Sequence, residues 1–266
     1  MKLQMKTYKF KVESFQPLTD TQWANINDLV EKTYVTGRPR KTNLRNVVDG
    51  IRYLVRTGCQ WRNVDTKYEK MSVLRYYFDL WTKNNTWSKI LKSLVSARRV
   101  QLGCEEEPDL GAIDSQSVKV VPLINEDKGI DGNKKINGRK RHIIVDSEGL
   151  LLAVYVGAAN ENDGKEGVKL LPELQGNYEN IEKITSDGAY RKTFEIEAKS
   201  CGIYVETTQK PESQQGFVPQ KGRWQVERSF AWLNFYRRLS KDYEKKAINS
   251  EIMIKLAFIS MILNHF

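Results

Sequence analysis

The order of apolar patterns in the second half of the chain constrains the fold more than any other feature. Three strand-like runs come first, at residues 110–121, 142–145 and 150–156. Helical and strand-like segments then alternate to the end of the chain. The predicted helices span residues 162–174, 191–199, 223–240 and 248–264, and the predicted strands between them span 181–186 and 203–207. Consecutive strands followed by alternating helices and strands imply an α/β fold with a mixed sheet and flanking helices.

This order of strands and helices matches the ribonuclease-H-like fold, although order alone does not prove it. The second and third strands are joined by Asp146-Ser147-Glu148-Gly149, a favourable turn sequence, and should form a hairpin. Because Asp is expected at such a turn for local reasons, Asp146 is not taken as a catalytic carboxylate.

Residues 18–100 predict a small all-helical region. Thr19 or Asp20 and then Asn43 can cap helices, and Gly58 can close one. The acidic break at residues 105–108 divides the chain into residues 1–104, which we expect to be a DNA-binding domain of helix-turn-helix type, and residues 105–266, the α/β domain. Basic side chains that would reach phosphates in this region are Arg52, Arg56, Arg62, Lys67, Lys70 and Arg75, although any small helical bundle has basic solvated faces.

The chain is basic, with 43 Lys and Arg against 33 Asp and Glu and a formal net charge of +10. Such a charge favours a polyanionic partner, usually nucleic acid, but also fits a protein that is merely basic. The sequence has no apolar run of transmembrane length and no secretory signal, so we expect a cytoplasmic protein with no membrane association.

Cysteine and histidine usage narrows the possible chemistry. Cys59, Cys104 and Cys201 are far apart, and His142 and His265 are the only histidines. A structural zinc site, a Ser-His-Asp triad and a Cys-His pair all lack parts. If the protein is an enzyme, Asp and Glu are the main remaining candidates, and oxygen ligands suit Mg²⁺, with Mn²⁺ as an alternative.

Two aspartates stand out by position. Asp114 lies inside the first predicted strand, where a carboxylate costs several kcal/mol unless a metal or hydrogen bonds compensate it. Asp187 ends the strand 181–186 and is followed by Gly188, and ligands bind at such strand ends in α/β sheets. An edge-strand Asp and a helix N-cap are the respective structural alternatives. Asp163 is explained by helix capping, with a supporting role at the site as a further possibility.

Glu227 lies in the predicted helix 223–240. Arg223, Asn234 and Arg238 fall on the same face of that helix as Glu227. A salt-bridged surface stripe would explain this pattern as well. The combination of a strand Asp, a strand-end Asp and a helical Glu in this order favours a catalytic triad of Asp114, Asp187 and Glu227. Three such carboxylates can hold two Mg²⁺ ions about 3.5–4 Å apart for phosphoryl transfer.

A basic run precedes the second predicted strand. We interpret it as a set of phosphate contacts rather than a solvated hairpin tip, which predicts strong salt dependence of binding. Trp224 and Trp232, if exposed, can stack on unpaired bases, although core packing is expected for at least one. The residues of this basic run are Lys134, Lys135, Arg139, Lys140, Arg141 and His142.

The chain resembles bacterial insertion-sequence transposases of the DDE type, in their IS-five branch. The resemblance covers nearly the whole chain. It is carried by Arg56–Arg62, Ile113–Ser117, Asn137–Asp146, Ser186–Tyr190 and Trp224–Leu233.

The resemblance implies a ribonuclease-H-like core, Mg²⁺, and action on double-stranded DNA at terminal inverted repeats. It assigns the triad to Asp114, Asp187 and Glu227, and pairing of two element ends implies a homodimer on DNA. The 40 positions from Asp187 to Glu227 leave no room for a large insertion domain. The superfamily's Tyr-Arg-Glu-Lys signature is only half present. Arg223 and Glu227 match it, whereas its Tyr and Lys positions hold Gln220 and Asn234, with Arg238 as a substitute on the same face.

Two other functions fit the sequence. A metal-dependent nuclease that cuts without strand transfer would have the same site, and only its products would differ. A non-catalytic, transposase-derived protein would bind DNA equally well with or without Mg²⁺.

Overall fold

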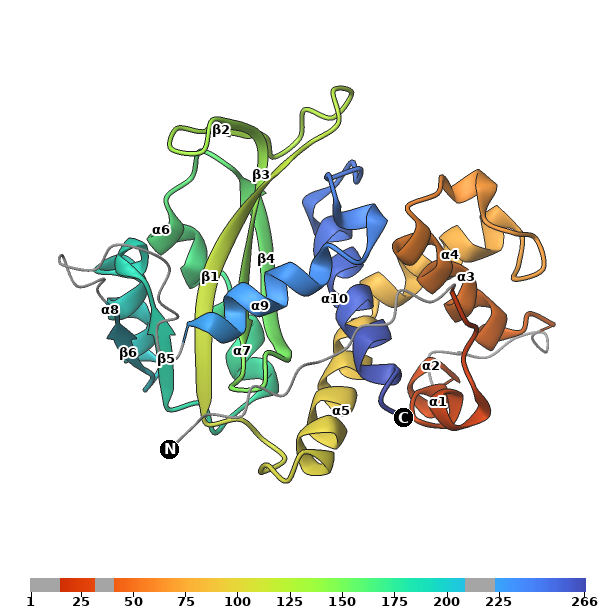
Figure 1. The fold of residues 1–266 in the computed structure, drawn as a ribbon, viewed down its shortest axis with the longest axis horizontal. Helices are drawn as coiled ribbons and strands as arrows, with labels where there is room; N and C mark the ends of the chain where they lie inside the picture. The colour runs from red at the N-terminus through yellow and green to blue at the C-terminus, as the bar shows by residue number, and fades with distance from the viewer. Residues whose placement is uncertain (1–14, 32–40, 209–222) are drawn as a thin grey trace.

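A mixed sheet occupies one side of the molecule and a group of short helices the other (Figure 1). The computed structural model describes residues 15–31, 41–208 and 223–266. Gln220, at the Tyr position of the signature, lies outside these residues. None of the helices in the described part of the chain has the length and apolar character needed to span a membrane.

The sheet has six strands. They are β1 (Leu110–Lys119), β2 (Gly129–Asp131), β3 (Ile136–Val145), β4 (Leu151–Ala158), β5 (Lys183–Ser186) and β6 (Tyr204–Thr207). Strand β3 pairs antiparallel with β1 on one side and with β4 on the other, and the short β2 pairs with the start of β3. Strand β5 pairs parallel with β1, and β6 pairs parallel with β5. The order β4-β3-β1-β5-β6 confirms the predicted ribonuclease-H-like mixed sheet.

Strand β3 begins six residues before the predicted start at His142. The apolar pattern did not predict the first half of this strand, because Arg139, Lys140 and Arg141 interrupt the apolar run. These three residues are nevertheless in register with β1 and buried. The true turn between β2 and β3 is residues 132–135.

The helices of the second half are α6 (Asp163–Val168), α7 (Leu171–Asn177), α8 (Thr193–Ser200), α9 (Trp224–Leu233) and α10 (Ala247–Leu263). The helix predicted at 162–174 is two helices, because Pro172, which lacks an amide hydrogen, lies in the first turn of the second one. The helix predicted at 223–240 ends at Leu233. A buried Tyr236 and a separate 3-10 turn at Arg237–Leu239, packed on the N-terminal helices, follow it.

The N-terminal helices are α1 (Asp20–Ala24), α2 (Asn27–Glu31), α3 (Leu44–Thr57), α4 (Met71–Lys83) and α5 (Thr86–Gln101), with a 3-10 turn at Trp61–Asn63. The predicted caps are confirmed. The Thr19 side chain accepts a hydrogen bond from the Gln22 amide, Asn43 caps α3, and Gly58 ends α3 in the left-handed region at φ 71°.

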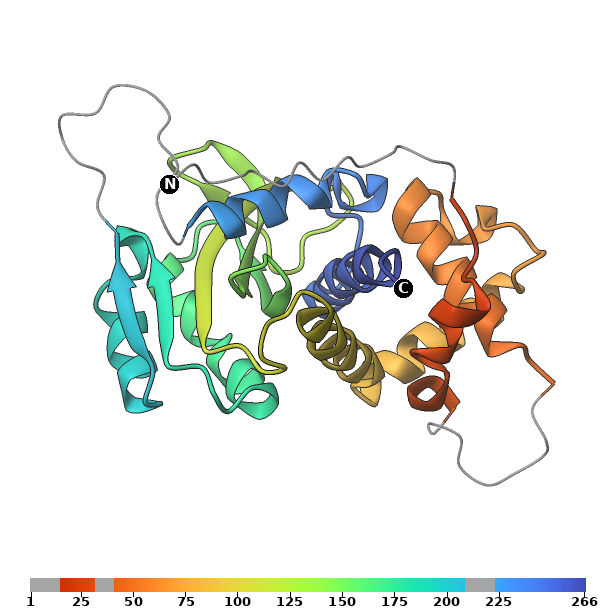
Figure 2. The ribbon, with the colours of Figure 1, turned by 60° about the horizontal axis from the view of Figure 1, so that its bottom comes forward.

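One apolar core runs through both halves of the chain. Helix α10 is apolar on all sides and is buried along almost its whole length, as expected for a helix inside a core. It lies beside α5, between the sheet and the N-terminal helices (Figure 2), and packs on α3, α5 and β4. The apolar core thus continues across the predicted division at residue 104.

Asp146 is confirmed as a turn residue and also joins the two halves. Its Oδ1 accepts hydrogen bonds from the amides of Glu148 and Leu150, as expected for the β3–β4 turn. Its Oδ2 lies 2.5 Å from Nη1 of Arg99 in α5, and both side chains are buried. This ion pair fixes the turn against the helix that leads into the sheet.

Candidate active site

The register of two parallel strands brings Asp114 and Asp187 together. The pairing of β1 with β5 ends at Ala112 and Thr185. Two residues further along the chain lie Asp114, within β1, and Asp187, directly after β5. Because side chains alternate along a strand and neighbouring strands run about 4.8 Å apart, the two carboxylates face the same side at adjacent positions. Both lie toward the carboxyl end of the parallel pair, where α/β sheets bind ligands.

Each aspartate uses one carboxylate oxygen locally and turns the other toward the same cation. Oδ1 of Asp114 accepts a hydrogen bond from the Ser115 amide at 2.7 Å, and Oδ1 of Asp187 accepts one from the Ala189 amide at 2.9 Å. Oδ2 of Asp114 lies 3.7 Å from Nη2 of Arg223, and Oδ2 of Asp187 lies 3.9 Å from the same nitrogen. The Arg223 guanidinium therefore bridges the pair.

The surroundings of Asp114 disfavour its charge. Burial raises its pKa from 3.8 to about 6, against the opposing effects of the Ser115 amide and Arg223, and the neighbouring Asp187 raises it further. A carboxylate in this position gains more than an exposed one from a bound cation, because the cation offsets the lost hydration.

Glu227 is not gathered with the two aspartates. It lies one turn after Arg223 on α9, which packs across β1 and β3, and its side chain is exposed. Among the residues that the structure describes, no three His, Cys, Asp or Glu side chains come close enough to hold a metal ion. The structure thus unites Asp114, Asp187 and Arg223, and it places Glu227 on the adjoining helix.

A polar network adjoins the pair. Ser115 donates a hydrogen bond to Oδ1 of Asp163 at 3.2 Å, and Lys140 pairs with the same oxygen at 2.8 Å. Asn162, and not Asp163, caps α6. The Asp163 side chain instead contacts Ser115 and Lys140 next to Asp114, which agrees with the supporting role considered for it. His142 and the Tyr190 hydroxyl share a hydrogen bond of 3.1 Å. Nothing in the sequence marked Ser115 or Tyr190 as site residues beyond their closeness in the chain to Asp114 and Asp187.

The predicted phosphate contacts of Arg139, Lys140, Arg141 and His142 are wrong in this structure, because these side chains are buried. Arg139 pairs with Asp242, Lys140 with Asp163, and Nη1 of Arg141 donates to the Leu239 carbonyl. Burial lowers the pKa of His142 to about 4, so its imidazole is neutral.

Arg52 of the helical region is likewise buried, in an ion pair with Asp49 at 2.8 Å. The expectation that Arg52 reaches phosphates is therefore also wrong. Lys134 and Lys135, by contrast, are exposed at the turn between β2 and β3 and stay candidates for DNA contact.

The placement of Arg238 on the face of Glu227 is also wrong. Helix α9 ends before Arg238, and the Arg238 side chain is buried with Glu244 at 2.7 Å and donates to the Cys59 carbonyl. It joins the segment after α9 to the N-terminal region. Asn234 is the exposed C-cap of α9.

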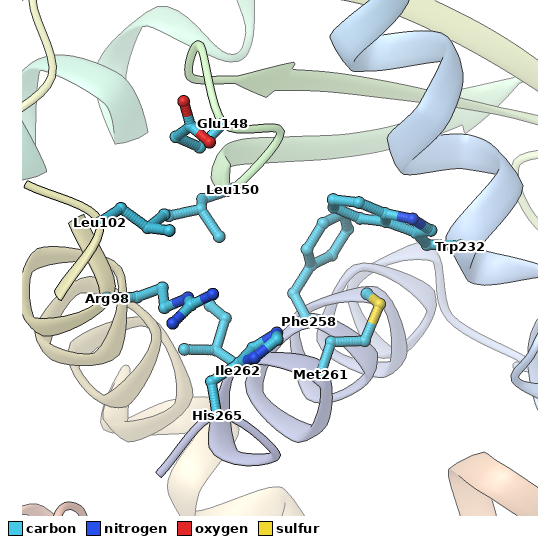
Figure 3. Close-up of a pocket in the computed structure, with 9 residues that line it drawn as sticks. All are labelled: Arg98, Leu102, Glu148, Leu150, Trp232, Phe258, Met261, Ile262 and His265. Atoms are coloured by element: carbon cyan, nitrogen blue, oxygen red, sulfur yellow. The ribbon is translucent and has the colours of Figure 1, made fainter. Parts of the chain in front are cut away.

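The two tryptophans of α9 differ in exposure. Trp224 is exposed, whereas Trp232 is half-buried, and the Arg228 guanidinium lies over both rings at 4.1 and 4.8 Å from their centroids. A pocket beside Trp232 is drawn in Figure 3, and its lining residues include none of the predicted metal ligands or phosphate contacts. They are Arg98, Leu102, Glu148, Leu150, Trp232, Phe258, Met261, Ile262 and His265.

Comparison with known protein families shows to which family the chain belongs. The family model of the transposase DDE domain matches residues 105–262, which is more than half of the chain and contains all three predicted triad residues. The chain belongs to the DDE transposase family. A second family model, described as a putative transposase of the IS4/5 family, matches residues 18–91 of the helical region. The predicted family is therefore confirmed.

The relatives of this DDE transposase domain are distant. A putative transposase for insertion sequence element IS402 from Burkholderia cepacia is 29% identical over 126 residues, which cover 45% of this chain. The match spans 60% of the length of that curated relative.

Two solved structures are similar at low identity. The catalytic core domain of BIV integrase has a TM-score of 0.36 and 15% identity, covering 57% of this chain and 82% of that one. The piggyBac transposase, in a synaptic complex with hairpin DNA, has a TM-score of 0.43 and 11% identity, covering 94% of this chain and 73% of that one.

Proposed function

We propose that the protein is a DNA transposase that cleaves at the terminal inverted repeats of an insertion sequence and joins the 3′ ends to target DNA. One observation carries the proposal. Asp114 in β1 and Asp187, directly after the parallel strand β5, lie at adjacent positions, and each presents its Oδ2 to one shared cation. The match to the transposase DDE domain supports the same reading.

The donor atoms fit a divalent metal. Oxygen donors from carboxylates are the ligands that Mg²⁺ and Mn²⁺ prefer. Asp114 and Asp187 would hold the ion through their Oδ2 atoms, while Ser115 and Ala189 fix the other oxygens through backbone hydrogen bonds. Glu227, exposed on α9 one turn after Arg223, would be the third ligand. When bound, Mg²⁺ supplies Lewis-acid stabilisation of the charge that develops on the phosphate oxygens.

DNA contacts would come from cations around this edge of the sheet. Lys134 and Lys135 are exposed on the β2–β3 turn, and charge from Lys134 acts on Asp114. Arg223 lies at the aspartate pair itself. The helical region matched by the IS4/5 family model would bind the terminal repeat, and a homodimer would pair the two element ends.

A cleavage and strand-transfer assay tests this function. Purified protein is incubated with labelled duplex DNA carrying the flanking terminal repeats, a plasmid target, and either Mg²⁺ or EDTA. We expect Mg²⁺-dependent cleavage and joined products. Cuts without joining would instead identify a nuclease, and binding without cuts, equal in Mg²⁺ and EDTA, would identify a non-catalytic DNA-binding protein.

Matched variants assign the residues. Asp114→Asn removes a metal ligand with almost no change in volume and should abolish cleavage while DNA binding persists. Asp109→Asn changes an exposed aspartate just before β1 and should leave cleavage intact. Wild-type cleavage by Asp114→Asn would exclude the proposed triad.

A further inference from the structure

The Arg223 guanidinium contacts the two carboxylates that would bind a metal cation. Its Nη2 lies 3.7 Å from Oδ2 of Asp114 and 3.9 Å from Oδ2 of Asp187, and its side chain is only 14% exposed. Both distances exceed the 2.7–2.9 Å of a charge-assisted hydrogen bond. The contact is therefore an ion pair shared between two carboxylates, rather than a tight bidentate fork with either one.

The two Oδ2 atoms that face the Arg223 guanidinium are also the atoms that a divalent cation at this pair would use. Each Oδ1 is held by a backbone amide, so Oδ2 is the atom that each aspartate offers to a cation. A divalent cation beside Arg223 would also repel its positive charge. Occupation of the pair by metal and its neutralisation by Arg223 are thus alternatives.

We propose that Arg223 is the counterion of Asp114 and Asp187 before metal binds, and that transfer of its guanidinium to a DNA phosphate couples DNA binding to metal binding. The inference rests on the proposed function, since it requires a divalent ion at this pair. Arg223 suits both partners because guanidinium pairs with carboxylate and with phosphate. Its position at the N-cap of α9 puts it one turn from Glu227.

Thermodynamic linkage between metal binding and DNA binding determines how each affects the affinity for the other. If Arg223 leaves the aspartates for a phosphate, metal binds an unoccupied pair, and if metal is already bound, Arg223 is available to the phosphate. Each ligand therefore raises the affinity for the other by the same factor. Couplings of this kind are typically about 5- to 150-fold.

Metal binding can be measured without any catalytic readout. Mn²⁺ is titrated into the DNA-free full-length protein and followed by the electron paramagnetic resonance of the free ion, with Asp114→Asn marking the binding that belongs to this site. Arg223→Gln removes the competing guanidinium, and we expect it to lower the Kd for Mn²⁺ about tenfold, within the usual range of such couplings. Circular dichroism verifies that the variant is folded.

Lys134→Gln is the matched control for charge alone. Lys134 acts on Asp114 through its charge but forms no ion pair with either aspartate in the described structure. It should therefore change the Kd for Mn²⁺ much less than Arg223→Gln does. In a second titration, duplex DNA that ends in the flanking terminal repeat should tighten Mn²⁺ binding more in the wild type than in Arg223→Gln.

The outcomes separate the inference from the proposed function. A site that is lost in Asp114→Asn but has equal Kd in the wild type and Arg223→Gln overturns the role of Arg223 alone. Equal changes in Arg223→Gln and Lys134→Gln, or equal tightening by DNA with and without Arg223, overturn it as well. Absence of any Asp114-dependent Mn²⁺ site in both proteins overturns the metal assignment and the inference together.

Discussion

Replacement of Arg139 by alanine separates a structural role of the basic run from DNA contact. Arg139 is fully buried in β3. Its guanidinium donates to the carbonyls of Glu126, Glu244 and Lys245 at 2.7, 2.8 and 2.9 Å and pairs with Oδ2 of Asp242 at 3.3 Å. Arg139→Ala leaves a buried carboxylate without its cation and three carbonyls without these donors.

The expected loss follows from the buried ion pair. Removal of one partner from such a pair costs about 3–5 kcal/mol, because the other charge stays buried and uncompensated. The lost hydrogen bonds act in the same direction. Since domains are stable by only about 5–15 kcal/mol, Arg139→Ala should lose a large part of its free energy of unfolding.

Urea unfolding followed by circular dichroism gives the free energy, and fluorescence anisotropy at several salt concentrations gives DNA affinity. Exposed Lys135 provides the contrast. Lys135→Ala should change stability by less than about 0.5 kcal/mol and, if Lys135 meets a phosphate, reduce the salt slope by about 0.9. The reasoning fails if Arg139→Ala unfolds at the wild-type urea concentration while its salt slope falls by that amount.

Three further substitutions test the fold. Asp146→Ala strands the buried Arg99 guanidinium and should cost about 3–5 kcal/mol in urea unfolding, whereas a loss below about 1 kcal/mol would mean that the pair does not join the two halves. Burial raises the pKa of Glu251 from 4.5 to about 7, so the folded state binds more protons than the unfolded state between these values, and stability falls as pH rises through them. Glu251→Gln should remove this pH dependence and add up to about 3 kcal/mol at pH 8, and an unchanged pH profile in thermal unfolding would contradict it. At Gly138 a Cβ would lie 1.9 Å from the Val118 carbonyl oxygen, so Gly138→Ala should destabilise the β1–β3 pairing by about 1–3 kcal/mol or more, while Gly132→Ala, with open space around it, should not. Equal melting temperatures for these two glycine variants would rule out that close approach.

Local sequence determined the features that depend on neighbours in the chain. Hydrogen-bonding side chains and a glycine marked helix ends at Thr19, Asn43 and Gly58, since caps act over three or four residues. The order of strands and helices predicted the mixed sheet. Asp114 was predicted to lie inside a strand and Asp187 at the end of one, and the register of β1 and β5 brings them to adjacent positions.

Tertiary structure alone decided which charges face solvent. A cation in a strand looks the same in sequence whether or not a distant segment covers it, and Arg139 is covered by residues 242–250, more than 100 positions later. The end of α9 at Leu233 has a similar cause, because packing of Tyr236 and the following turn, rather than a helix-breaking residue, ends the helix. The sequence predicted Asp114, Asp187 and Glu227 as one group. In the structure, Arg223 contacts the two aspartates, and Glu227 lies outside the pair on α9. The orientation of α9 on the sheet decides this, and it depends on packing between elements that are distant in the chain.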